Sequence, residues 1–162
     1  ITKSNFGHST ISVNNELHVV DGLATIADFK DGAIPEATFD MSPTFEGQLK
    51  SAQRKFVKDS PTSLIIEDKI EILETTNWIT WQLMTTAEVN VVNGGAVLVK
   101  DGKKLNLEIL SHPDLTVTVV SLYPAPLELD KQIEGLKRLE IRIPAWIIQD
   151  GSTNIKVRLF GE

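Results

Sequence analysis

Short runs of alternating apolar and polar residues constrain this chain more than any other feature of its sequence. The runs are rich in Val, Ile and Thr, and Gly, Asn, Asp and Pro separate them. Alternation puts the apolar side chains on one face of a β-strand, and the separating residues are those that turns require. The pattern predicts an all-β chain folded as an antiparallel β-sandwich of the super-sandwich type, with roughly a dozen strands.

Asn-Gly and Asp-Gly pairs mark the clearest turns. Asn93–Gly95 separates Glu88–Val92 from Ala96–Lys100, and Asp101–Gly102 separates the second run from Leu105–Leu110. Such pairs between alternating runs are strong hairpin signals, because their residues tolerate positive φ angles. The sequence therefore predicts a meander over this stretch.

A further hairpin is predicted near the start of the chain. Ser9–Val13 and Glu16–Val20 both alternate, and the Asn14–Asn15 pair between them suits a tight turn. Ser63–Ile72 is rich in Ile and is predicted to be a long strand that crosses the core. Other strands are predicted at Ala24–Phe29, Trp78–Met84, Leu115–Leu122, Arg138–Ile143 and Ile155–Phe160.

Two segments resist a single assignment. Phe45–Val57 contains many good helix formers, but we favour strand over helix there. Leu127–Leu136 fits a short helix or a loop over a sandwich edge. No repeat, linker or low-complexity tract divides residues 1–162, so the sequence predicts one domain.

Composition excludes several classes of function. The formal net charge of the 162 residues is −6, and no basic cluster stands out, so nucleic acid is not expected as a partner. The chain has no Cys, which removes disulfides and thiolate chemistry, and no apolar stretch long enough to span a bilayer. Ile1 is not an initiator residue, so we expect a mature product or an excised fragment.

The three histidines offer little chemistry by themselves. His18 is expected to face solvent from a strand, and His112 precedes Pro113 in a turn. His8, with Asp21 and Asp28, is the candidate for a zinc site, although this spacing is not diagnostic. Ser9 is not expected to act as a nucleophile with His8 as its base, because neighbours in a strand point to opposite faces.

The remaining reactive groups have ordinary structural interpretations. Asn93–Gly95 lies between strands, so no helix N-terminus is available there to hold a phosphate. Trp78, Trp81 and Trp146 fit core positions better than an aromatic platform for sugars, although an extended strand puts the first two on opposite faces. We expect the clustered carboxylates to lie on the surface and not to form a glycosidase pair. They are Glu67, Asp68, Glu71 and Glu74.

Four stretches, in order along the chain, resemble the C-terminal part of heparinase II/III-like polysaccharide lyases. Phe6–Asn14, followed by Val19–Gly22, is similar to their His-(Asn/Ser)-Thr-hydrophobic strand and the turn after it. Ser51–Arg54 is similar to the strand before their central strand, and Leu64–Lys69 resembles the central strand that ends in Asp-(Arg/Lys). Trp81–Thr85 resembles the Trp-Gln-Leu strand that follows. The resemblance covers most of the chain.

The resemblance implies a parent protein with an N-terminal helical toroid and C-terminal antiparallel sheets. Such lyases cleave acidic polysaccharides, glycosaminoglycans among them, by abstracting the C5 proton of a uronic acid and expelling the 4-linked sugar. In the family a Tyr and a His of the toroid do this chemistry with help from the sheet domain, and no toroid is present in this sequence. We therefore expect an accessory, cleft-lining domain with no catalytic residue of its own. Its partners would be the toroid of the same protein and an acidic polysaccharide, in the periplasm or outside a bacterial cell.

The resemblance also implies a role for His8. In members similar to heparinase II, the matching His completes a metal site with a His-x-His motif and an Asp that lie upstream. This sequence begins after both, so His8 would be one ligand of a structural zinc in the full-length protein and the site would be incomplete here. Ser9 stands where other members have Asn, which leaves the type of site open.

Two other functions stay open from the sequence alone. A stand-alone carbohydrate-binding β-sandwich would use Trp78, Trp81 or Trp146 as contact residues. A complete small hydrolase would need converging acid and base groups, which the sequence does not reveal.

Overall fold

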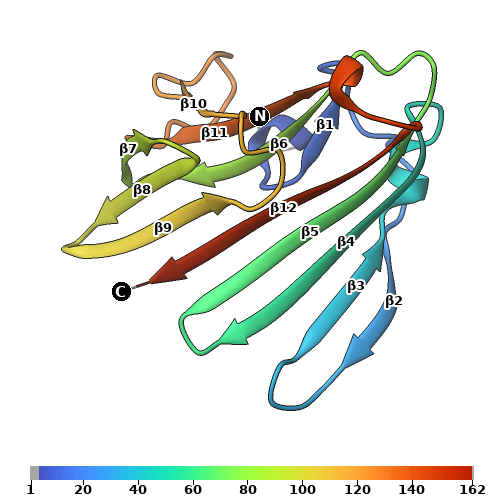
Figure 1. Ribbon diagram of the computed structural model, residues 1–162. Coiled ribbons are helices and arrows are strands. Elements are labelled where there is room, and N and C mark those ends of the chain that lie inside the picture. The colour runs from blue at the N-terminus through green and yellow to red at the C-terminus, as the bar shows by residue number, and fades with distance from the viewer. Residues whose placement is uncertain (1–3, 162) are drawn as a thin grey trace.

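A computed structural model describes residues 4–161, which form two antiparallel β-sheets (Figure 1). The smaller sheet has the strand order β1 (Ile11–Val13), β6 (Trp78–Thr85), β11 (Lys137–Pro144) and β10 (Val117–Ser121). The larger sheet has the order β2 (Thr25–Lys30), β3 (Glu36–Asp40), β4 (Leu49–Ser60), β5 (Ser63–Ile72), β12 (Ser152–Gly161), β9 (Lys103–Ile109), β8 (Gly95–Lys100) and β7 (Glu88–Val92). The helical elements are the short 3-10 turns η1 (Asn5–Gly7), η2 (Ser42–Phe45) and η3 (Ala145–Ile147).

The predicted all-β sandwich is confirmed, with 4 strands in one sheet and 8 in the other. Alternation along each strand builds the core, because every second side chain points between the sheets. Ile70 of β5 and Val157 of β12 meet Trp81 and Ile141 of the smaller sheet in one buried apolar cluster. No helix within residues 4–161 is long and apolar enough to cross a membrane.

The ends of the larger sheet differ in burial. Figure 1 shows β2 and β3 at one end and β7, β8 and β9 at the other. Every residue of β2 is exposed, whereas β8 and β9 contribute Leu98, Leu107 and Ile109 to the core. The smaller sheet is half as wide in strands, so it cannot cover the larger one completely.

The meander and the central strand are confirmed. β7, β8 and β9 pair in sequence, with positive φ angles at Gly94, Asp101 and Gly102 in their turns. β5 occupies the predicted range and lies between β4 and β12. Phe45–Val57 was assigned correctly as mainly strand, since β4 begins at Leu49 after η2.

The hairpin predicted at the start of the chain is wrong. β1 pairs with β6, and residues 16–20 form no strand. Asn14 and Asn15 do have positive φ angles, but the Asn14 side chain accepts hydrogen bonds from the backbone N–H groups of Asn77 (2.8 Å) and Trp78 (3.2 Å). The turn is thereby tied to the start of β6, and the chain leaves the sheet instead of pairing with β1.

Two further segments complete the comparison with the sequence. β3 was not predicted, because Glu36–Asp40 is short and mostly polar, yet it pairs with both β2 and β4. Residues 127–136 contain no helix or strand, which fits the loop alternative.

Candidate functional site

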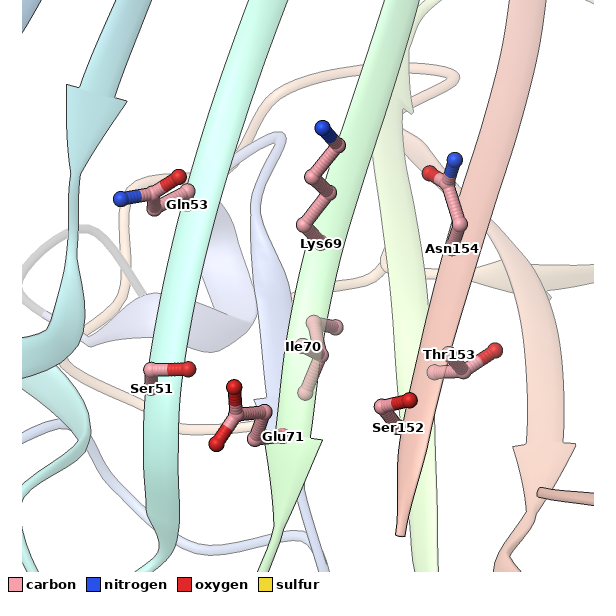
Figure 2. Close-up of a pocket in the computed structure, with 8 residues that line it drawn as sticks. All are labelled: Ser51, Gln53, Lys69, Ile70, Glu71, Ser152, Thr153 and Asn154. Carbon is pink, nitrogen blue, oxygen red and sulfur yellow. The ribbon is translucent and has the colours of Figure 1, made fainter. Parts of the chain in front are cut away.

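A polar groove crosses the outer face of the larger sheet where β4, β5 and β12 run side by side (Figure 2). Its volume is about 460 Å³. The strand register aligns its polar side chains in two cross-strand rows, because each partner pair on neighbouring strands shares a face. The rows are Gln53, Lys69 and Asn154, and Ser51, Glu71 and Ser152.

Lys69 is the cation at the centre of this groove. Within residues 4–161, no ion pair or side-chain hydrogen bond holds its ammonium group. Gln53 and Asn154 flank it with amide groups, and the Asn154 amide donates a 2.6 Å hydrogen bond to Glu67. An unpaired cation between two amides is suited to a ligand that carries an anionic group and hydroxyls.

Two other cations of this face, on the neighbouring strands β4 and β12, form ion pairs, which distinguishes Lys69 from them. Lys55 lies 2.8 Å from Glu36, and this contact raises the pKa of Lys55 and lowers the pKa of Glu36. Arg158 lies 3.2 Å from Asp59. The outer face is therefore a network of exposed ion pairs with one unpaired lysine in its hollow.

A second hollow, of about 550 Å³, brings His8 and His18 together near the start of the chain. The prediction that His18 faces solvent from a strand is wrong. His18 is half-buried and lies outside the strands. Its Nε2 lies 2.8 Å from the carbonyl oxygen of Ile11, and its ring contacts Phe45 edge-on with 4.5 Å between centroids. Burial, with smaller contributions from His8 and Arg54, lowers the pKa of His18. The imidazole is thus a neutral packing group.

His8 itself is exposed at the rim of this hollow. Within residues 4–161, His, Asp and Glu side chains form no group of three that could hold a metal ion, so Asp21 and Asp28 do not join His8. One imidazole cannot make a zinc site, which needs three or four ligands. The assignment of His8 as a metal ligand stays a prediction. The Ser9 hydroxyl accepts a 3.0 Å hydrogen bond from the Met84 backbone.

The four stretches that carry the lyase resemblance meet inside the sandwich. Arg54, from the second stretch, makes two hydrogen bonds of 2.7 and 2.8 Å to the Asp68 carboxylate of the third. Its Nη1 donates a 3.0 Å hydrogen bond to the carbonyl of Ser9, in the first stretch. Gln82, from the fourth stretch, donates a 2.7 Å hydrogen bond to the Ser12 hydroxyl. The shared residues therefore hold the two sheets to the N-terminal segment.

Asp68 is completely buried, which corrects the expectation that it lies on a solvated surface. Burial raises the pKa of Asp68, and the Arg54 guanidinium opposes that rise. Both carboxylate oxygens are occupied by Arg54. Asp68 is consequently a structural anion and not half of a glycosidase pair.

The three tryptophans have three different environments. Trp81 is 1% exposed and belongs to the core, and Trp78 is half-buried with Arg142 5.5 Å above its ring. Trp146, on η3, is 85% exposed. The expected core role is confirmed for Trp81 only.

The residues of the outer groove could not be recognised as a site from the sequence. Ser152–Asn154 follows Lys69 by more than eighty positions, and only the antiparallel pairing of β12 with β5 makes them neighbours. The one available signal was the polar alternation of these strands, which most solvent-facing strands share.

Comparison of folds gives consistent matches to one group of enzymes. A heparan sulfate lyase, HepC, from Pedobacter heparinus matches with a TM-score of 0.71 and 15% identity, over 96% of this chain and 24% of that one. The chain has the fold of one part of these lyases. Heparinase III matches with a TM-score of 0.71 and 12% identity over 95% and 23%, and the heparinase III BT4657 gene product with 0.71 and 9% over 98% and 24%.

The chain thus spans about a quarter of the length of the enzymes that it resembles. No known protein family matches its sequence. No curated protein matches it in sequence either. The likeness that these comparisons show is one of fold.

Proposed function

We propose that this chain is the C-terminal β-sandwich domain of a heparinase II/III-like polysaccharide lyase. The observation that carries the proposal is the match of nearly the whole chain to one quarter of heparan sulfate lyase and heparinase III structures. The parent protein would cleave uronic-acid-containing glycans by β-elimination, with a helical toroid of the same protein as the domain's partner. It would act in the periplasm or outside the cell, where such polymers are met.

In this proposal the sandwich contributes binding, and the rest of the parent contributes the chemistry. The groove around Lys69 would hold an acidic unit of the polysaccharide, with the ammonium group against a carboxylate or sulfate. The amides of Gln53 and Asn154 would hydrogen-bond to neighbouring hydroxyls. The net charge of −6 repels acidic polymers over the rest of the surface. Contact with such a polymer would therefore depend strongly on an unpaired lysine.

Zinc enters the proposal only through His8. A structural zinc in the full-length protein would need at least two ligands from outside residues 4–161, since the described residues do not form a site. No step of the proposed function depends on it.

The lyase proposal is tested on the full-length protein that contains this chain. We expect it to release unsaturated uronate products, followed by their ultraviolet absorbance, from at least one acidic polysaccharide. A matched neutral glycan, which has no uronate to undergo β-elimination, should give none. Hydrolysis to saturated products, or no turnover of any uronate polymer, would contradict the proposal.

Binding at the groove is tested by titrating the purified chain with acidic oligosaccharides. Lys69→Ala should weaken binding, whereas Lys103→Ala, which removes the same charge from an exposed position on β9, should not. Equal losses in both variants would show that net charge, and not this groove, determines the affinity.

A further inference from the structure

Trp146 lies on η3, the short turn between β11 and β12, and its side chain is exposed to solvent. At 85% exposure it is unusual for so large an apolar side chain. It lies at the edge of a hollow of about 430 Å³, which is within the range of roughly 300–1,000 Å³ that small-molecule sites occupy. The hollow is lined by His112, Asp114, Leu115, Pro144, Trp146 and Ile147.

The backbone around this hollow is held in place. The Ala145 N–H donates a 2.8 Å hydrogen bond to the Asn77 carbonyl, and the Ile148 N–H closes the turn on Ala145 at 3.0 Å. Leu115 and Ile147 pack against the core. A ligand at Trp146 would therefore meet a surface that needs little ordering before it binds.

Two polar side chains, of His112 and Asp114, also line the hollow. His112 has a positive φ angle of 54°, and its Nε2 lies 3.1 Å from the Thr153 hydroxyl. Burial lowers the pKa of His112, so the ring is neutral at neutral pH. Asp114 is exposed, and no hydrogen bond or ion pair within residues 4–161 holds its carboxylate. The lining of the hollow thus includes both an unoccupied acceptor and a flat aromatic ring.

The chemistry of this hollow selects one class of ligand. A pyranose ring presents a face of C–H groups, which packs on an indole, and an edge of hydroxyls, which donate to a carboxylate. Among residues 4–161 no cation lines the hollow, so Asp114 disfavours a uronate or a sulfated sugar. A quaternary ammonium is less well matched, because such ligands are held by cages of several aromatic rings and Trp146 stands alone here.

We propose that the hollow beside Trp146 binds an uncharged hexopyranose unit of a glycan. This site is separate from the Lys69 groove and does not depend on the lyase activity proposed above. Trp146 provides the stacking surface, and Asp114 accepts hydrogen bonds from two ring hydroxyls.

The test is a titration of the isotopically labelled chain with neutral gluco-, manno- and galacto-oligosaccharides, followed by the indole N–H signals in nuclear magnetic resonance spectra. At least one series should shift the Trp146 signal saturably and leave the buried Trp81 signal in place. Trp146→Ala should lower the affinity about tenfold, and Trp146→Phe, which keeps a ring, should lower it less. Asp114→Ala should also weaken binding, and the affinity should not change with salt.

Three outcomes would overturn the proposal. The first is the absence of a Trp146 shift with all three series. The second is binding that choline displaces, which would assign the hollow to cations. The third is a preference for acidic over neutral oligosaccharides at Trp146. None of these outcomes bears on turnover of uronate polymers by the full-length protein, so failure here is distinguishable from failure of the lyase proposal.

Discussion

The inner and outer faces of β4 and β5 carry charges with opposite roles. On the inner face Arg54 and Asp68 form a buried ion pair, and one position away along each strand Gln53 and Lys69 lie side by side on the outer face. The inner charges pair with each other through two hydrogen bonds, whereas Lys69 has no ion-pair partner within residues 4–161. The same strands thus use charge to hold the fold on one side and leave it available for a ligand on the other.

The largest expected effect is on the inner face. Asp68→Asn should destabilise the fold by about 3–5 kcal/mol, because it leaves the Arg54 cation buried without a counter-charge. Urea unfolding measures this loss. The double variant Arg54→Met, Asp68→Leu is the control, and it should recover most of the stability, since apolar side chains replace both charges. If Asp68→Asn alone were as stable as the wild type, the structural role given to this pair would be contradicted.

On the outer face, Lys69→Ala should change binding and not stability. We expect about a fivefold to tenfold loss of affinity for acidic oligosaccharides, the size of one charge-assisted hydrogen bond at a partly solvated site. Isothermal titration calorimetry gives the affinity, and urea unfolding should give an unchanged midpoint. Loss of stability in this variant would remove the distinction between the two faces.

The half-buried His18 makes the stability of the fold depend on pH. Its pKa is lowered from an ordinary value of 6.5, so the folded state favours the neutral ring. The stabilisation is full above 6.5 and is lost as the pH falls through the lowered pKa, because the unfolded chain takes up the proton first. Stability should therefore fall as the pH drops below 6.5 toward the lowered pKa of His18.

The variant His18→Gln should flatten this pH dependence in urea unfolding curves. His8→Gln, at an exposed position in the same hollow, is the matched control and should change the curve much less, because His8 makes only a small contribution to the lowered pKa of His18. An unchanged slope in His18→Gln would mean that other groups cause the loss at low pH. His112, whose pKa burial also lowers, is the first of these to replace.

The smallest effect is expected from the exposed ion pair of Lys55 and Glu36. Both side chains reach solvent, and exposed pairs contribute little to stability. Lys55→Ala should leave the urea midpoint unchanged within error. A loss comparable to that of Asp68→Asn would show that the outer network stabilises the fold as strongly as the buried pair.

The sequence predicts the local parts of this fold well and the non-local parts poorly. The β7–β8–β9 meander follows from turn residues at fixed positions, and the apolar run of β5 is sufficient to identify a core strand. β1 was given the wrong partner, because the competing partner β6 lies more than sixty residues away and is tied by the Asn14 side chain. A tight-turn pattern does not reveal such a bond.

The same difference applies to the sites. Arg54 and Asp68 lie in stretches that resemble lyases, but their pairing depends on the register of β4 and β5. The Lys69 groove depends on β12, and the Trp146 hollow joins the segments before β10 and after β11. Each is assembled from residues distant in sequence, so side-chain chemistry alone could not place them.

The most direct test of the account compares turnover by the purified 162-residue chain and by the full-length protein on the same acidic polysaccharides. Formation of unsaturated uronate is the readout. The account predicts product from the full-length protein and none from the chain, even where the chain binds the polymer. Product formed by the chain itself would contradict the account, because the described residues would then have to supply the acid and base that we assign to the rest of the parent.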